Sequence, residues 1–221
     1  MLGLGRRDSA PDGLDVAAIR RGLVAERIGT HLYVFGEVPS TNDALRDLAH
    51  AGAREGTVVL AEAERARVPA TAPTDLFVSV LFRPAIAVAG APVFSFMSAL
   101  ALTDAMWTLG AAATVEAPNA MVIGGRRIAT SHLDVVTAED RVAHVVIGVA
   151  VNANAGRETL AASDTSLREH LGRPIDRNSL AADYLNRLEA WTGRYRAQGP
   201  QVIVTAWNER DMLTPLLRRG R

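Results

Sequence analysis

The sequence predicts an α+β fold built on a mixed, mainly antiparallel β-sheet. Two observations support this. Apolar, β-branched segments of strand length follow one another in hairpin-like succession, and helical segments are interspersed among them. This order is typical of the α+β class. The 221 residues are enough for one large domain, or for one domain with a small appendage, and for a buried core.

The amino-terminal part begins with a helix that is expected to end near Gly29, because apolar residues over 16–24 follow a helical period. The segment HLYVFGEV, residues 31–38, is aromatic and β-branched and therefore predicts a strand. Ser40 or Thr41 is then expected to cap a short helix, since both residue types satisfy free N–H groups at helix starts. Gly52 closes that helix.

A strand, a loop, a strand and a buried helix are expected next. The segment GTVVLAEA at 56–63 is almost continuously apolar, which indicates a buried strand. Two prolines make 64–74 a loop, and a further strand, DLFVSVLFRP, covers 75–84. Pro92 marks a helix start, and the helix over 93–110 is apolar nearly all round, so we expect it to be buried.

The central part predicts a succession of antiparallel strands. Two short strands are expected at 114–116 and 120–123. A Gly-Gly pair then supplies the positive φ angles of a tight hairpin into a strand over 126–137. An acidic pair turns the chain into a further strand, rich in valine, over 141–154.

The carboxyl-terminal part is expected to be helical. Asp164 or Thr165 opens a short helix that ends near Gly172. Asp176 caps a longer helix with an apolar stripe, and a last helix covers 201–213.

The composition excludes several classes of protein. Basic and acidic residues number 24 each, so the chain has no net positive charge that would favour the binding of nucleic acid. Every basic residue is arginine, and therefore no lysine side chain is available as a tunable base or an acyl acceptor. No apolar run is expected to approach a membrane span, and no signal peptide is expected at the amino terminus. The sequence contains no cysteine. We expect a cytoplasmic protein that contacts neither membrane nor nucleic acid.

Two polar segments are candidates for a site, and each has two interpretations. VPSTNDAL, residues 38–45, is either a helix cap or a cluster that offers donors to a small neutral head group. IGVAVNAN, residues 147–154, is either a strand entering a turn or a strand that points Asn152 into a ligand site. The His132–Asp134 pair favours a polar strand face, and the five scattered histidines predict no metal site.

Taken together and in order, six segments resemble the catalytic domain of the biotin protein ligases. They are VPSTNDALRDLA, EGTVVLAEAE, DLFVSVLFRP, APNAMVIGGRRIA, VVIGVAVNAN and DTSLREHLGRPIDRNSL. The resemblance implies a mixed sheet with helices packed on one face, and a family that uses ATP and Mg²⁺ to join biotin, through biotinyl-adenylate, to a lysine of a biotin carrier domain. It also implies three parts: an amino-terminal segment with a helix at 1–27, the ligase-like domain at 28–196, and a helix with an Arg-rich tail at 197–221, where the family's carboxyl-terminal β-barrel is absent.

The resemblance assigns roles to individual residues. Ser40, Thr41 and Asn42 match the family's biotin-contacting S-T-N segment, and Asn119 lies in its K-W-P-N-D motif. The remaining matches are Asn152 at the end of a strand, Glu64 at a glutamine position, and Arg127 at the position of the lysine that would hold the adenylate.

The departures from the family fall on the chemistry. The segment that should cover biotinyl-adenylate is short, and Arg67 stands for its first glycine. The K-W-P-N-D motif reads EAPNA over 116–120, while Thr130 and Ala150 replace glycines. Fixed cations that face the phosphates contribute much of the catalysis of adenylation. We therefore predict a catalytically silent relative that binds either a protein partner or a ligand, the ligand being biotin or a related small acid. Oligomers are compatible with this prediction. The alternatives are an active but diverged ligase and a purely structural subunit.

Overall fold

The computed structural model describes residues 13–65, 74–116 and 119–219, with side chains up to Arg210. Within these residues one seven-stranded sheet has the order β1-β2-β3-β7-β6-β5-β4. The strands are β1 (Leu32–Val38), β2 (Val58–Glu64), β3 (Leu76–Phe82), β4 (Thr114–Glu116), β5 (Ala120–Ile123), β6 (Arg126–Ala138) and β7 (Arg141–Val151). Only β1 and β2 pair in parallel, and the other neighbours are antiparallel. The predicted α+β class and the mixed, mainly antiparallel sheet are therefore confirmed.

In the part of the chain that the structure describes, six α-helices and two short 3₁₀ turns accompany the sheet. The helices are α1 (Val16–Gly22), α2 (Thr41–His50), α3 (Val93–Thr108), α4 (Leu167–Leu171), α5 (Arg177–Gln198) and α6 (Gln201–Arg219), and the turns are η1 (Val88–Gly90) and η2 (Arg157–Thr159). Asp176 caps α5 as predicted, and Ser40 caps α2. Neither Asp164 nor Thr165 caps α4: that helix starts later, because Ser166 accepts the Glu169 N–H.

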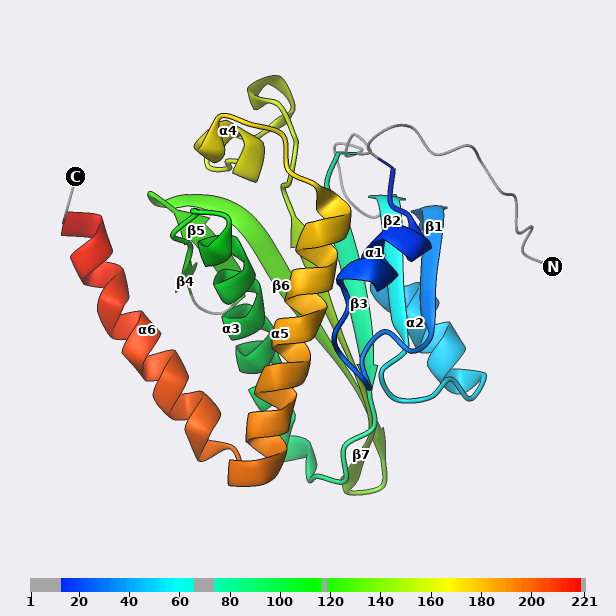
Figure 1. Ribbon diagram of the computed structural model, residues 1–221. Helices are drawn as coiled ribbons and strands as arrows, with labels where there is room; N and C mark the ends of the chain where they lie inside the picture. Colours follow the sequence, from blue (N-terminus) through cyan, green and yellow to red (C-terminus); the bar gives the residue numbers. More distant parts are fainter. Residues whose placement is uncertain (1–12, 66–73, 117–118, 220–221) are drawn as a thin grey trace.

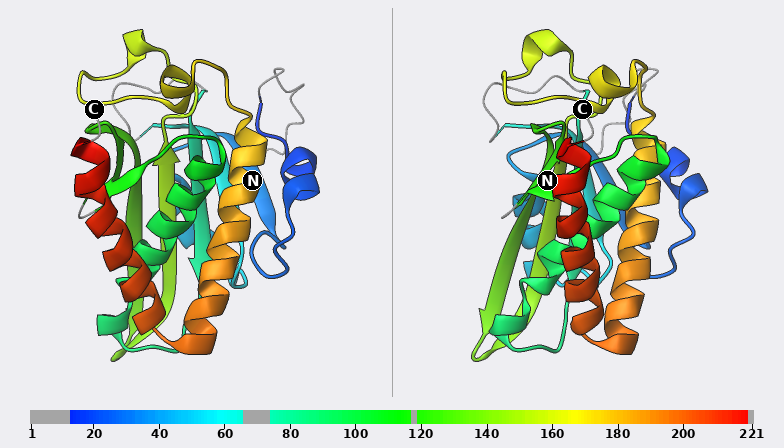
Figure 2. Two further views of the ribbon diagram at one scale, coloured as in Figure 1. Left: turned by 60° about the vertical axis from the view of Figure 1, so that its left-hand side comes forward. Right: turned by 90° about the vertical axis from the view of Figure 1, so that its left-hand side faces the viewer.

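The two faces of the sheet are covered differently. Helix α3 lies on one face with α5 and α6 beside it, and α1 packs on α5 (Figure 1). Figure 2 shows this helical layer from two further sides. Helix α2 covers the opposite face, where Leu45 and Ala49 pack against Val59, Leu81 and Val146. The expectation that helices pack on one face thus holds for the main layer. Helix α2 is an exception: it packs on the strand side chains that alternate to the opposite face.

One described stretch, Val88–Thr108, has the length and hydropathy of a membrane span, contrary to the expectation that no run comes near it. In this fold the stretch contains α3, which contacts the sheet, α5 and α6. Most of it is buried inside the protein. A core helix with neighbours on several sides needs apolar residues all round, so packing explains its composition.

Polar side chains of α5 fasten the amino-terminal segment. Asn186 accepts the N–H groups of Val24 and Ala25, and Glu189 accepts those of residues 26, 27 and 28 at 2.8–2.9 Å. These contacts take the place of helical hydrogen bonds, and α1 therefore ends at Gly22, before the end near Gly29 that the sequence predicts. Desolvation opposes ionisation of Glu189, but the three N–H groups outweigh it and lower its pKa.

Glu189→Gln should lower the free energy of unfolding by about 1–2 kcal/mol at pH 7, because a neutral amide offers one acceptor atom where two carboxylate oxygens now serve. Since the folded-state pKa of Glu189 is lowered, its stabilisation is present above its unfolded pKa of about 4.3 and is lost as the pH falls through the folded value. Denaturant unfolding measures both effects. The exposed Glu26→Gln is the matched control, and equal losses in the two variants would refute the assignment.

Candidate functional site

The predicted S-T-N segment lies at the amino terminus of α2 and meets the end of β2. Ser40 Oγ accepts the backbone N–H of Asn42 at 3.2 Å. Thr41 is almost fully buried, and its backbone N and its Oγ1 each lie 2.6 Å from Glu64 Oε1. The structure thus brings four of the predicted site residues, Ser40, Thr41, Asn42 and Glu64, into one group, which we call the α2 group.

Ser79 links the members of the α2 group. It is fully buried in β3, and its Oγ lies 2.8 Å from Thr41 Oγ1 and 2.6 Å from Asn42 Oδ1. An amide oxygen can only accept, so the single Ser79 proton goes to Asn42. In the sequence, Ser79 is the one hydroxyl in the apolar strand LFVSVLF, but a single serine in a strand does not by itself predict a site residue.

Asn42 also reaches β6. Its Nδ2 donates to Asp134 Oδ2 at 3.0 Å, while Asp134 Oδ1 lies 3.1 Å from His132 Nε2. Ser131, which directly precedes His132, lies on the other face of the sheet and is buried. The His132–Asp134 pair is therefore the polar strand face that the sequence favours, now connected to the α2 group.

Gly148 makes this arrangement possible. A Cβ built on Gly148 would lie 2.1 Å from Asn42 Oδ1 and 3.1 Å from Ser79 Oγ. Real Cβ atoms do not approach another atom that closely, so the amide can rest on β7 only where β7 has no side chain. The glycine is needed here for close approach.

Arg127 and Asn152 form a second group, which we call the β7-end group. The backbone of Arg127 forms a bridge with the segment 163–165, donating to Ser163 O and accepting from Thr165 N at 2.8 Å each. Its guanidinium pairs with Asp164 Oδ2 at 2.8 Å. Asn152 Nδ2 donates to Thr165 O at 3.0 Å. Both candidates are thus held by one loop, residues 157–166.

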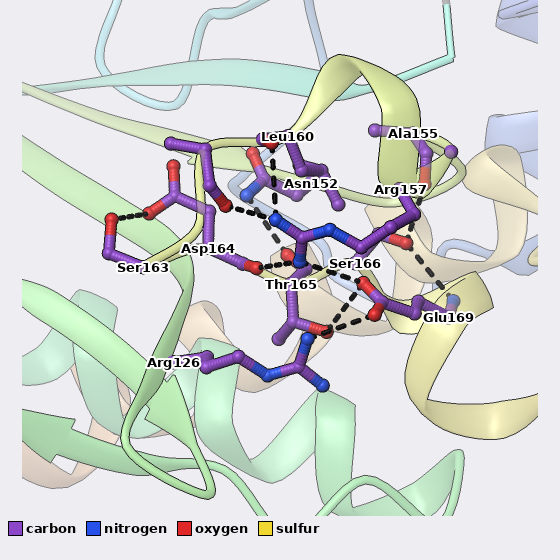
Figure 3. A network of polar contacts seen from close by, with 12 residues as sticks. Arg126, Asn152, Ala155, Arg157, Leu160, Ser163, Asp164, Thr165, Ser166 and Glu169 are labelled. Atoms are coloured by element: carbon purple, nitrogen blue, oxygen red, sulfur yellow. Dashed lines mark hydrogen bonds and ion pairs between the residues drawn. The ribbon is translucent and has the colours of Figure 1, made fainter.

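That loop is fixed by further charged residues (Figure 3). Arg126 and Arg157 approach the two carboxylate oxygens of Glu169 at 2.9 and 3.6 Å. Arg157 also donates to the carbonyl oxygens of Leu160, Ala161 and Asp164. The hydrogen bond from Arg126 is the main cause that lowers the pKa of Glu169; desolvation opposes it, and the charges of Arg126 and Arg157 and a hydrogen bond from Thr165 add to it.

Asn119 belongs to neither group. Its Nδ2 donates to Ser131 O at 3.1 Å, and its carbonyl oxygen accepts the Ser131 N–H at 2.9 Å. It therefore fastens the turn before β5 to β6. Two other positions of interest, Pro118 and Arg67, lie outside the described residues.

The two groups share one face of the sheet. Gly148, Ala150 and Asn152 follow at alternate positions, so Gly148 and Asn152 are about 13 Å apart along the chain. Ala150 lies between them and pairs directly with Thr130 of β6. The two side chains that replace family glycines are thus neighbours, midway between the α2 group and the β7-end group.

Chemically, the α2 group consists of hydroxyl, amide and carboxylate groups, and the β7-end group contributes one amide and one guanidinium. No cluster of three or more histidine or carboxylate residues suited to a metal ion occurs among the described residues. The carboxylates of the two groups instead accept hydrogen bonds from the protein or pair with arginine.

Known proteins resemble this chain in sequence and in fold. No family model matches the chain. The bifunctional ligase/repressor BirA of Bacillus subtilis and that of Bacillus spizizenii are each 28% identical to it over 209 residues, which cover 89% of this chain and 64% of BirA. The chain is a biotin protein ligase-like domain. It spans less than two thirds of the length of these curated relatives.

Solved structures share the fold of this biotin protein ligase-like domain. Biotin protein ligase from Aquifex aeolicus superposes with a TM-score of 0.69 at 16% identity, covering 82% of this chain and 77% of the ligase. The same ligase has been solved in complex with biotin and ATP. A biotin protein ligase-like protein of unknown function from Silicibacter sp. superposes with a TM-score of 0.66, also at 16% identity, covering 80% of this chain and 76% of that protein.

Gly148→Ala should lower the free energy of unfolding by about 1–3 kcal/mol, because the added methyl group displaces the Asn42 amide from its buried partners. Gly193→Ala is the matched control. Gly193 lies within α5 with open space around its Cβ position, so alanine there should stabilise the helix by up to about 1 kcal/mol. Thermal unfolding of both variants tests this; equal midpoints would show that the close approach does not matter.

Proposed function

We propose that this biotin protein ligase-like domain is silent or strongly impaired in ATP-dependent formation of biotinyl-adenylate, and that it acts by binding a ligand or a protein partner. The observation that carries the proposal is that its candidate ligand-binding side chains are already engaged by the protein. Asn42 uses its amide oxygen on Ser79 and its amide nitrogen on Asp134. A head group could bind Asn42 only by replacing these bonds, which costs free energy.

The β7-end group supports the same conclusion. Formation of an adenylate needs cations that face the phosphates as negative charge develops, and such a donor is typically worth several kcal/mol. Arg127 instead pairs with Asp164, whose carboxylate offsets the positive charge. Arginine also lacks the compact ammonium group of lysine.

The strand surface between the two groups supports the proposal as well. Thr130 and Ala150 add side chains at one cross-strand pair, where the family has glycines. A ligand that extends from the α2 group towards Asn152 would have to pass over both. Glu64, at the family's glutamine position, adds a carboxylate beside the head-group residues, which disfavours an anionic ligand.

Partner binding is supported by the edge of β6. Strand β5 pairs with β6 only as far as Thr130, and beyond Ser131 no described strand pairs with its outer edge. Unpaired N–H and C=O groups along an edge can receive a strand from another chain. A biotin carrier domain or a second copy of this chain would fit such an edge.

The alternative is an active but diverged biotin–carrier ligase, or a related acyl ligase. The shared fold favours it, since a solved biotin protein ligase with this fold binds biotin and ATP. In that case ATP and Mg²⁺ would activate the acid, and a lysine of a carrier domain would accept it. Exchange of pyrophosphate into ATP separates the two functions because it reports the adenylation step alone.

We expect no biotin-dependent pyrophosphate exchange from this protein, nor from Arg127→Lys. Lysine would restore the ammonium group but would leave Glu116, Ala120 and the Thr130–Ala150 pair in place, and defects in one shared site are not additive. The measurement is exchange of labelled pyrophosphate with biotin and, separately, with lipoate.

A second variant serves as the control. It combines Arg127→Lys with the family's sequence over 116–120 and its glycine- and arginine-rich loop. Activity in this graft alone would support an intact fold in which several active-site residues have been replaced. Turnover by the unaltered protein near 1 s⁻¹ or above would contradict the proposal.

Biotin should bind no more tightly than about 1 µM, or roughly −8 kcal/mol, because the α2 group must give up internal hydrogen bonds. Titration calorimetry measures this. Ser79→Ala frees the Asn42 oxygen and should alter the affinity if biotin reaches this group, whereas Ser95→Ala, on the far side of the sheet in α3, should not. Nanomolar binding by the unaltered protein would contradict the expectation.

A further inference from the structure

A buried histidine lies under the carboxyl-terminal half of α2. His144, in β7, is 4% exposed, and among the described residues no protein atom forms a hydrogen bond with its Nε2. His144 pairs with Val136 of β6 and lies on the face of the sheet that α2 covers. This residue takes no part in the α2 group or the β7-end group.

The ionisable groups that face His144 are basic residues. The ring of His50, in the last turn of α2, contacts it edge-on with centroids 5.4 Å apart. Arg46 of α2 and Arg83, directly after β3, also act on His144 electrostatically. Arg83 is held in place because it donates to the carbonyl oxygens of Ala49 and Ala53 at the end of α2.

The nearby carboxylates are committed elsewhere. Asp43 and Asp134 both pair with Arg46, and Glu55 accepts the backbone N–H of Arg83. From β6 the group opposite His144 is the apolar Val136. A proton on His144 would therefore place a buried positive charge beside Arg83, His50 and Arg46 without a carboxylate to balance it.

We propose that α2 is an acid-sensitive element, in which protonation of His144 loosens the carboxyl-terminal half of the helix from the sheet. The apolar contacts that oppose this are limited, since Leu45 and Ala49 are the buried residues of α2 in that cluster and Ala44 and Leu48 are only partly buried. Because the other end of α2 carries Thr41 and Asn42, acid would also disturb the α2 group. This inference does not depend on whether the protein is an active ligase.

The direction in which stability changes with pH follows from the linkage between proton binding and folding. Burial is the largest cause that lowers the pKa of His144, followed by the charges of Arg83, His50 and Arg46. The unfolded chain therefore binds a proton at a higher pH than the folded protein does. Stability contributed by neutral His144 is complete above the unfolded pKa of about 6.5 and declines as the pH falls from there to the folded value.

Amide hydrogen exchange at pH 7.5 and pH 5.5, corrected for intrinsic rates, tests the proposal. Protection of the amides of residues 45–50 should fall at the lower pH by at least about threefold, while that of α5 should change less. In His144→Phe, which keeps an aromatic ring beside His50, the fall in α2 should be largely lost. His31→Gln removes an exposed histidine and should behave like the unaltered protein.

A titration of the unaltered protein by NMR gives an independent test that needs no folded variant. His144 should titrate below the usual range, and the amides of α2 should shift with the same midpoint. Equal pH dependence in His144→Phe and the unaltered protein would overturn the proposal. So would an α2 that keeps its protection while His144 becomes protonated.

Discussion

The rest of this structure depends on one requirement: the polar groups buried beneath α2 must have hydrogen-bond partners. Asn42 lies against the sheet, and each end of its amide has a partner: Ser79 for the oxygen and Asp134 for the nitrogen. The arrangement joins α2 to β3 and β6, and Gly148 lets it rest on β7. A helix held in this way can be a rigid edge of a ligand site, but the bonds that hold it are also the bonds a ligand would use.

The antiparallel register decides how the departures from the ligase pattern act together. Thr130 and Ala150 are twenty residues apart in the chain, yet they form one cross-strand pair. Each replacement by itself adds a small group. As neighbours on one face they would both narrow the ligand path that we propose between the S-T-N segment and Asn152, so repairing one position should gain little.

The loop at 157–166 gives the arginine at the family's lysine position a structural role. It bridges to the backbone of Arg127, pairs with its side chain through Asp164, and is held in turn by Arg157 and Glu169. The guanidinium is about half exposed, so its ion pair contributes little to stability. The ion pair matters because it holds the positive charge of Arg127 against Asp164, in a loop of the same chain.

The sequence by itself determined the class of fold, most element positions and the resemblance to biotin protein ligases. Strand and helix periods, the caps Ser40 and Asp176, and the Gly-Gly hairpin are local signals that neighbouring residues carry. Tertiary structure alone decided that α2 crosses to the opposite face, that Glu189 ends α1 early, and that Ser166 rather than Asp164 or Thr165 caps α4. It also decided that Ser79 joins Thr41 and Asn42 and that His144 lies among cations. The physical reason is that these contacts join residues far apart in the chain, whose pairing depends on sheet register and burial rather than on local pattern.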